Sequence, residues 1–174
     1  LLNMHGGKAL GISGKDANFI VAQPKANGKY GLVGEIININ SGVIERLLED
    51  KFIPVIAPIA SGNEVNHPGF NINADLAASK IAAALHAKKI IFMTDIVGVL
   101  DKEKNLLETL TEKEIEAYKK DKTIVGGMIP KVDACLEAVN AGVEKAHIID
   151  GRVEHSILLE VFTSEGIGTV IKKS

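Results

Sequence analysis

Short runs of consecutive apolar residues recur along the 174-residue chain, each ending in loop or helix-start residues. The runs cover residues 53–59, 90–93, 146–149 and 169–171. Apolar runs this short, bounded by turn signals, are typical of buried strands. We therefore predict four buried strands.

Helical spacing separates these runs. Apolar residues recur at intervals of three or four in two segments, at Ala77, Ile81, Ala84 and Leu85 and again at Val132, Leu136 and Val139. Strands that alternate with helices predict an α/β fold whose sheet is largely parallel and covered on both faces. A further short helix is predicted through residues 111–120, because Thr111 and Glu114 have the spacing of a capping box.

Residues 19–37 depart from the alternating pattern. Two β-prone runs flank residues 24–28, and Asn27-Gly28 is typical of the tip of a hairpin. We expect an antiparallel appendage there. No repeat, low-complexity tract or linker divides the chain, so residues 1–174 are expected to form a single α/β domain.

Composition restricts the classes of protein to which the chain can belong. Apolar residues make up 46% of it and charged residues 24%, which suits a globular protein with a hydrophobic core. With 20 basic and 22 acidic residues it lacks the positive field that holds a nucleic acid, so no such partner is expected. The single cysteine, Cys135, excludes an internal disulfide, and no apolar run nears the roughly 20 residues of a membrane-spanning helix. We expect a cytoplasmic protein with no membrane partner.

Asn71, Asn73 and Asp75 form the first set of candidate site residues. Alternation puts the two asparagines on one side of an extended segment, with Asp75 in the first turn of the helix that follows. A structural interpretation is a helix cap, with Asn73 as the N-cap residue and Asp75 favoured by the helix dipole. This leaves Asn71 unexplained, so a binding role stays open.

Gly126 and Gly127, followed by Pro130 and Lys131, form the second set. Paired glycines let the backbone approach a ligand, and Pro130 suits the first turn of a helix. Lys131 then lies near a helix N-terminus, where the dipole disfavours a cation by about 0.3–1 kcal/mol. A bound phosphate would compensate for this cost. The alternative is an exposed lysine with its ammonium group in water.

The third set is the loop of residues 94–101, directly after the apolar run 90–93. Ligands bind outside the C-terminal ends of strands in open α/β sheets, so this loop is well placed for a nucleotide. Asp95 could accept hydrogen bonds from ribose hydroxyls or an adenine amino group. The alternative is an ordinary turn carboxylate.

Several common catalytic motifs are absent from the sequence. It has no G-x-x-x-x-G-K-[ST] phosphate loop, no G-x-G-x-x-G after a strand, no G-x-S-x-G nucleophile elbow, and no Cys or His set with metal-ligand spacing. Zinc enzymes and serine hydrolases are therefore disfavoured.

The three sets together resemble, in order and spacing, those of the acetylglutamate kinases, a branch of the amino acid kinase family. Further matches are residues 11–16 with the hairpin after them, residues 149–156 and residues 166–169, so the resemblance covers essentially the whole chain. It implies an open, mainly parallel αβα sandwich. It also implies transfer of the γ-phosphoryl group of ATP to the side-chain carboxylate of N-acetyl-L-glutamate, in arginine biosynthesis.

The resemblance further implies individual roles. Lys131 would stabilise the phosphoryl group during transfer, and Asp75 would orient lysines around it. Asn71 would bind acetylglutamate, and Asn73 would support that site. The nucleotide would be held by Asp95, Ile96, Val97, Gly98, Val99, Leu100, Thr123, Ile124 and Val125. Mg²⁺ would be held mainly by the ATP phosphates, without a protein metal site.

Family members begin with a glycine-rich turn and a lysine that this sequence lacks. We therefore expect the chain to be a portion truncated at its N-terminus and inactive alone. Such a portion is expected to leave sheet edges and apolar faces uncovered. Since family members form dimers or hexamers, a homodimer or higher homo-oligomer is expected.

Arginine-inhibited members of the family have an effector site whose residues match His147, Glu160 and Gly166. The resemblance thus implies arginine as an effector. The alternative is that His147 is a strand residue and Glu160 a solvated helix residue.

Two other functions stay open. One is a different amino acid kinase, of the glutamate 5-kinase, aspartokinase or uridylate kinase type. The other is a non-catalytic module that binds nucleotide or arginine.

Overall fold

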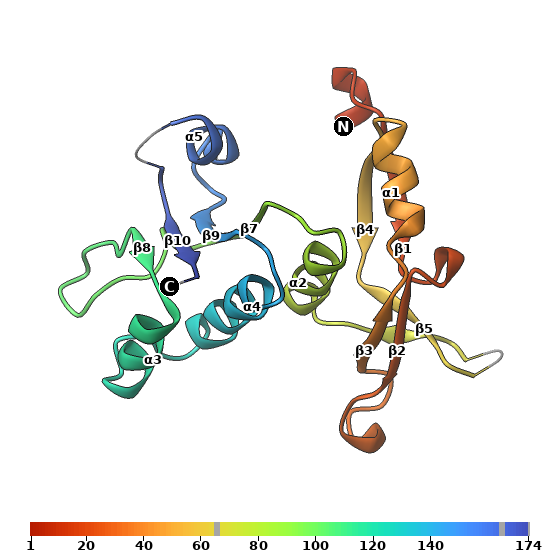
Figure 1. Cartoon of the computed structure of the whole chain (residues 1–174), viewed down its shortest axis with the longest axis horizontal. Coiled ribbons are helices and arrows are strands. Elements are labelled where there is room, and N and C mark those ends of the chain that lie inside the picture. The colour runs from red at the N-terminus through yellow and green to blue at the C-terminus, as the bar shows by residue number, and fades with distance from the viewer. Residues whose placement is uncertain (65–66, 164–165, 174) are drawn as a thin grey trace. The chain divides into compact units, whose positions relative to one another are not determined.

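The protein is described here from a computed structural model that covers residues 1–64, 67–163 and 166–173. The chain forms two compact units, Leu1–Leu85 and His86–Ser174, and each is considered by itself. Each unit combines strands with helices, as Figure 1 shows. The α/β fold class is confirmed, with parallel strand pairs in both units. The single domain over residues 1–174 stays a prediction.

The first unit contains two sheets. Its elements are the 3-10 helices η1 (Leu2–His5), η2 (Asp16–Asn18) and η3 (Lys25–Gly28), the strands β1 (Ala9–Ser13), β2 (Ile20–Pro24), β3 (Gly34–Ile39), β4 (Ile53–Ala57), β5 (Ile59–Gly62) and β6 (Phe70–Asn71), and the helices α1 (Gly42–Glu49) and α2 (Ala74–Ala84). Strand β1 pairs in parallel with β4, and the other sheet has the order β3-β2-β5-β6.

The apolar run at residues 53–59, predicted as one strand, is instead two strands. Strands β4 and β5 lie on either side of Pro58 and belong to different sheets. Proline has no backbone N–H, so it cannot donate in a continuing strand ladder. Its carbonyl oxygen is used, however, since it accepts a hydrogen bond from the N–H of Ile72 at 2.9 Å.

The predicted hairpin forms, because β2 and β3 pair antiparallel from Ile20↔Ile39 to Pro24↔Gly34. Its connection is longer than a two-residue turn and runs through η3 to Val33, with Asn27 and Gly28 at positive φ angles of 53° and 84°. The hairpin is not an appendage, since β2 also pairs in parallel with β5. The sequence around the turn could not indicate this second neighbour.

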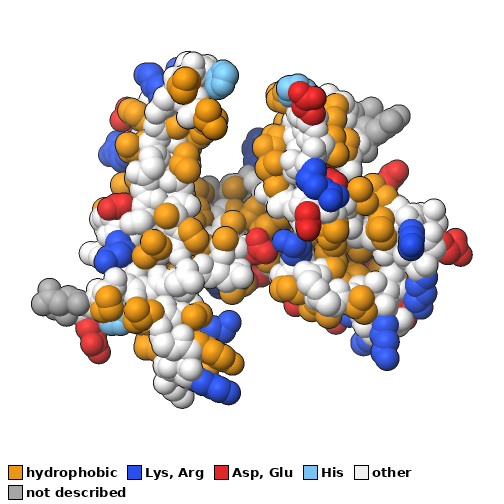
Figure 2. All heavy atoms as spheres, turned by 180° about the vertical axis from the view of Figure 1, so that it is seen from behind, with side chains coloured by type: hydrophobic (Ala, Val, Ile, Leu, Met, Phe, Trp, Pro, Cys, Tyr) orange, Lys and Arg blue, Asp and Glu red, His pale blue; other side chains and the backbone are white. Residues whose placement is uncertain are grey.

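The core of the first unit lies between its strands and helices. Its buried members are Phe19, Ile20, Ala22, Ile44, Ala60, Phe70, Ile72 and Ala77. Other apolar side chains of β1 and β4 stay exposed: Leu10 is 41% exposed, Ile53 45% and Val55 49%. Hydrophobic side chains are accordingly visible at the surface in Figure 2.

The second unit has one four-stranded sheet of order β7-β9-β10-β8. Its elements are the strands β7 (Lys89–Thr94), β8 (Thr109–Leu110), β9 (Lys145–Asp150) and β10 (Thr169–Lys172), and the helices α3 (Glu112–Lys120), α4 (Met128–Asn140) and α5 (Ser156–Phe162). Strand β9 is parallel to β7 and antiparallel to β10. Helices α4 and α5 both pack on β9, and Figure 1 shows them on opposite sides of it.

The helices of the second unit follow their predicted patterns. In α4, Val132, Leu136 and Val139 are buried, as the spacing predicted. The capping box before α3 is confirmed, because Glu114 Oε2 accepts hydrogen bonds from the Thr111 N–H at 2.8 Å and from its hydroxyl at 2.6 Å. No helix in the described part of the chain is long and apolar enough to span a membrane.

Gly14 provides a test of packing in the first unit. A Cβ atom at Gly14 would lie 2.5 Å from the carbonyl oxygen of Ile59, in the backbone of β5, and 2.6 Å from Cβ of the fully buried Ile20. We expect Gly14→Ala to lower the free energy of unfolding by about 1–3 kcal/mol, as overpacked cores do.

Gly42→Ala is the matched control in the same unit. A Cβ atom at Gly42, the first residue of α1, would meet nothing within 4 Å. This variant should gain about 0.4–1 kcal/mol through the smaller entropy of its unfolded chain. Urea unfolding followed by circular dichroism measures both, and equal effects of the two substitutions would contradict the packing argument.

Candidate functional site

A pocket of about 240 Å³ lies in the second unit, after the C-terminal end of β7. Its lining consists of Ile96, Gly98, Val99, Leu100, Asp101, Thr123, Ile124, Val125 and Met128. The first wall is residues 96–101, which follow β7. The second wall is residues 123–125, between α3 and α4, together with Met128, the first residue of α4.

Most of the predicted nucleotide residues meet in this pocket. Of the nine, only Asp95 and Val97 are outside its lining. The structure adds Asp101, directly after the first predicted run, and Met128, three residues after the second. Met128 follows Gly126-Gly127, close in sequence to residues 123–125. This proximity could have predicted that it lines the same pocket.

Hydrogen bonds fix the base of each wall. In the first wall, the Val99 N–H donates to Oγ1 of Thr169, a fully buried residue of β10, at 2.8 Å. In the second, the Ile124 N–H donates to the carbonyl oxygen of Tyr118 in α3 at 2.9 Å. Gly98 has a φ angle of 146°, and a Cβ there would lie 2.7 Å from Thr169 Oγ1, so glycine is required.

Asp95 lies at the edge where β7 and β9 both end. Its carboxylate accepts a hydrogen bond from the hydroxyl of Thr94 at 3.2 Å, and the Gly151 N–H donates to the carbonyl oxygen of Thr94 at 2.8 Å. Arg152 forms a bidentate pair with Asp150, with distances of 2.9 and 2.7 Å. Hydrogen bonds from the Arg152 side chain, and then from its backbone N–H, lower the pKa of the Asp150 carboxyl to about 2. Both charges of the pair are thus kept at neutral pH beside the loop that follows β7.

Lys131 is half-buried in the first turn of α4, three residues after Met128 of the pocket. The two glycines before the helix are open: a Cβ at Gly126 or Gly127 would meet nothing within 4 Å. Gly126 has a φ angle of 56°, which explains one glycine. Packing does not explain Gly127, whose open surroundings leave room for a ligand near the positive end of the α4 dipole.

Asn71, Asn73 and Asp75 lie together on the first unit, at the N-terminus of α2. The N-cap prediction is confirmed, because Asn73 Oδ1 accepts a hydrogen bond from the Leu76 N–H at 3.1 Å. Asn71 and Asn73 are exposed on the same side, with Ile72 buried between them at 3% exposure. Asp75 is in the first turn, as predicted. Capping accounts for Asn73 and leaves the exposed amide of Asn71 unexplained.

His147, Glu160 and Gly166 also meet, in the second unit. His147 Nδ1 and Glu160 Oε1 are 2.5 Å apart, and Glu160 Oε2 accepts a hydrogen bond from the Ile167 N–H at 2.8 Å. A Cβ at Gly166 would lie 3.0 Å from Glu160 Oε2. Glu160 is only 6% exposed, so its interpretation as a solvated helix residue is wrong. Among the described residues, His147 Nε2 is buried with no hydrogen-bond partner.

In residues 1–64, 67–163 and 166–173, no group of three or more acidic, histidine or cysteine side chains could hold a metal ion.

The chain is similar in sequence to curated proteins of two bacteria. A protein of Nitratiruptor sp. named "Acetylglutamate kinase" is 68% identical over 98% of this chain and 60% of its own length. One of Nautilia profundicola, with the same name, is 62% identical over 100% of this chain and 61% of its own length. The chain thus spans about 60% of the length of these curated relatives.

Solved structures share the fold. An N-acetylglutamate synthase from Neisseria gonorrhoeae, complexed with coenzyme A and L-arginine, has a TM-score of 0.82 at 25% identity and covers 94% of this chain and 38% of its own. The protein smu.665 from Streptococcus mutans has a TM-score of 0.79 at 32% identity, over 98% of this chain and 63% of its own. The sequence model described as the amino acid kinase family matches residues 1–150. This chain therefore belongs to the amino acid kinase family.

Proposed function

We propose that the chain is part of a cytoplasmic kinase that transfers the γ-phosphoryl group of ATP to the side-chain carboxylate of N-acetyl-L-glutamate. The observation that carries the proposal is the pocket of the second unit, where two loops distant in the sequence meet. Relatives named acetylglutamate kinase at 68% and 62% identity support the choice of acceptor. The role of ATP is consistent with membership of the amino acid kinase family.

The pocket suits the base of an adenine nucleotide. Most of its lining is apolar, including Val99, Leu100 and Ile124, and ligand pockets typically combine such surfaces with a few polar groups. Asp95, at the adjoining strand ends, is assigned to the ribose hydroxyls or the adenine amino group. Its position agrees with the rule that ligands of open α/β sheets bind beyond the C-terminal ends of strands.

Lys131 and the N-terminus of α4 are assigned to the phosphates. An oxygen of the acceptor carboxylate attacks the γ-phosphorus, and the bond from phosphorus to the β–γ bridging oxygen breaks, so ADP leaves with that electron pair. Such transfer needs positioning and neutralisation of charge more than covalent help from the protein. Lys131 provides a cation, and the positive, N-terminal end of the α4 dipole also favours the phosphate charge. Mg²⁺, held mainly by the phosphates, would neutralise part of their charge.

Asn71, Asn73 and Asp75 are assigned to the acceptor side. The exposed amide of Asn71 is available for the polar groups of acetylglutamate, and Asn73 fixes the turn that presents it. Asp75 is assigned to orienting lysine side chains around the phosphoryl group. A homodimer or larger homo-oligomer and regulation by arginine are parts of the same proposal.

Replacing Lys131 tests the proposed chemistry. The experiment uses a protein that contains this chain and is as long as its curated relatives. Lys131→Ala should lower kcat about 100- to 1000-fold, the usual loss for one preorganised charge-stabilising group. The Kd for ATP should change far less, because the cation acts on charge that develops during transfer. Lys120→Ala, at an exposed lysine of α3, is the control. Equal losses in kcat and ATP affinity would contradict the assigned role.

An acceptor screen tests the substrate in the same protein. Acyl phosphate, trapped with hydroxylamine, should form with N-acetyl-L-glutamate and much less with L-glutamate, L-aspartate or UMP. Asn71→Ala should raise KM for the preferred acceptor and leave KM for ATP unchanged. Preference for another acceptor would replace acetylglutamate in the proposal, and no transfer to any of them would favour a non-catalytic module.

Arginine binding tests the proposed effector site of His147, Glu160 and Gly166. L-Arginine should raise the melting temperature of the chain by about 2–4 °C for each kcal/mol that binding adds to the free energy of unfolding, whereas L-lysine should not. Glu160→Gln should abolish the shift, because the guanidinium group then loses its carboxylate partner. Glu108→Gln, at an exposed site of the same unit, should keep it. The same shift with L-lysine as with L-arginine would remove arginine from the proposal.

A further inference from the structure

Lys102, the residue after the first wall of the pocket, lies in a tight turn that Asp101 closes. Asp101 Oδ1 accepts hydrogen bonds from the N–H groups of Glu103 and Asn105, both at 2.8 Å, and its Oδ2 accepts one from the Asn105 side chain at 3.0 Å. The Asn105 side chain, and then its backbone, lower the pKa of Asp101. The carboxylate that closes the turn is therefore charged at neutral pH, and the backbone at Lys102 is constrained.

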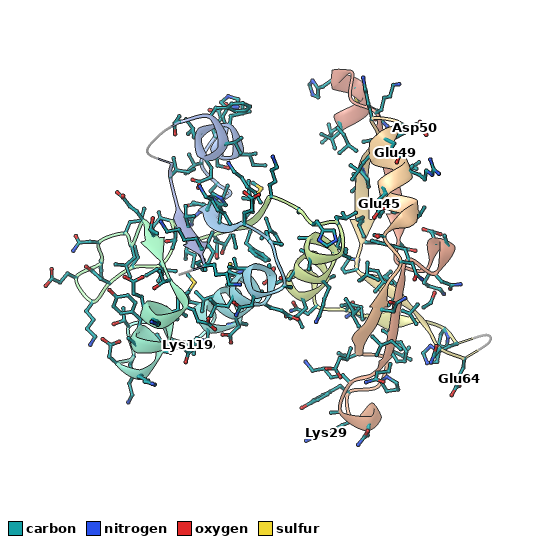
Figure 3. The ribbon with its side chains drawn as sticks, in the orientation of Figure 1. Lys29, Glu45, Glu49, Asp50, Glu64 and Lys119 are labelled. Atoms are coloured by element: carbon teal, nitrogen blue, oxygen red, sulfur yellow. The ribbon has the colours of Figure 1, made fainter. Side chains whose placement is uncertain are left out.

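The second wall is also held by an aspartate that accepts a backbone hydrogen bond. This residue is Asp121, which follows α3. Asp121 Oδ1 accepts a hydrogen bond from the N–H of Thr123, a lining residue, at 3.0 Å. The helices on either side of this connection are tied by Lys119, labelled in Figure 3, which lies 2.5 Å from Asp133 Oδ1 of α4. The position of Thr123 thus depends on Asp121 and on two helices that are joined to each other.

Lys102 and Asp121 connect the two walls directly. Lys102 Nζ is 3.0 Å from Asp121 Oδ2, the oxygen that the Thr123 N–H does not use. One carboxylate thus holds the second wall with one oxygen and the turn beyond the first wall with the other. Hydrogen bonds from Thr123 and then Lys102 lower its pKa to about 2, so the pair stays charged throughout the neutral range.

We propose that the Lys102–Asp121 ion pair is a strap that fixes the separation of the two pocket walls and so strengthens nucleotide binding. The proposal rests on the function proposed above only for the identity of the ligand. Lys102 and Asp121 are 62% and 45% exposed, and ion pairs this exposed contribute little to global stability. Their effect is instead local, because holding both walls in place before binding reduces the ordering cost that the ligand must overcome.

The strap differs in its consequences from a direct contact between Lys102 and the phosphates. A strap acts on the pocket, so its loss weakens an uncharged nucleoside and a nucleotide by the same factor. A phosphate contact weakens only the charged ligand. Adenosine and ADP are therefore the two probes, with affinities measured on the chain by NMR titration and by calorimetry.

Lys102→Met and Asp121→Asn should each weaken adenosine and ADP by the same factor, about 2- to 5-fold, as for exposed pairs. The asparagine keeps an oxygen for the Thr123 N–H, so it removes the charge and leaves the turn. The double variant should bind no more weakly than either single one, since both remove one interaction. Lys102→Arg should restore binding, and added NaCl should weaken adenosine binding to the wild type but not to Lys102→Met.

Arg46→Met is the matched control. Arg46 and Glu49 form an exposed ion pair on α1 at 2.9 Å, with Glu49 labelled in Figure 3, and it belongs to the first unit. Its loss should change neither affinity. Weaker ADP binding with unchanged adenosine binding, or additive losses in the double variant, would overturn the strap.

Amide hydrogen exchange separates failure of the strap from failure of the proposed function. If the wild type bound neither adenosine nor ADP, the nucleotide assignment would fail and the strap would still be decided by exchange at Thr123. Lys102→Met should speed that exchange about 1.4- to 5-fold, the range for loss of one exposed ion pair. Arg46→Met should leave it unchanged. Equal exchange rates at Thr123 in the wild type and Lys102→Met would reject the strap whatever the ligand.

Discussion

Parallel pairing of β7 with β9 is the constraint on which the rest of the second unit depends. The register runs from Lys89↔Lys145 to Thr94↔Asp150, so both strands end at the same edge. Parallel neighbours need a crossover connection, and here it contains α3 and α4. The loop after β7 and the start of α4 are thereby both available to form a pocket, although they are far apart in sequence. The Gly151 N–H, which donates to the carbonyl oxygen of Thr94, joins the two strand ends.

Much of this unit could be predicted because it depends on local patterns. The apolar runs gave β7, β9 and β10, the spacing in α4 matched its buried face, and the Thr111–Glu114 cap starts α3. The first wall of the pocket was predictable from the rule that ligands bind beyond strand ends, whereas residues 123–125 were implied only by the resemblance to the acetylglutamate kinases. The Lys102–Asp121 ion pair could not be predicted, because both residues occur in charged stretches of sequence that are typical of solvated surface. Their pairing depends on the turn that Asp101 closes, which no pattern of charges reveals.

The first unit shows the opposite case, where neighbours in space override local signals. Pro58 divides an apolar run that looked continuous, and β4 and β5 then join different sheets. The hairpin was recognised from its turn, but its second neighbour, β5, lies well over a dozen residues further along the chain.

The interpretation of Glu160, in the second unit, as a solvated residue was wrong for a related reason. A lone acidic residue on a short helix is usually exposed, but hydrogen bonds with the facing His147 and from the Ile167 N–H make the burial of Glu160 possible.

Residues 166–169 serve two polar clusters at once, which explains why this short stretch has so little freedom. The Ile167 N–H donates to Glu160, whereas Oγ1 of Thr169 accepts from Val99 in the first wall of the pocket. Between them, a side chain at Gly168 would collide with the carbonyl oxygen of Ile148. The stretch must therefore satisfy the His147–Glu160 pair and the pocket wall along one close path over β9. Lys102 acts on the outer end of that wall, so the wall is held from the buried sheet on one side and from an exposed ion pair on the other.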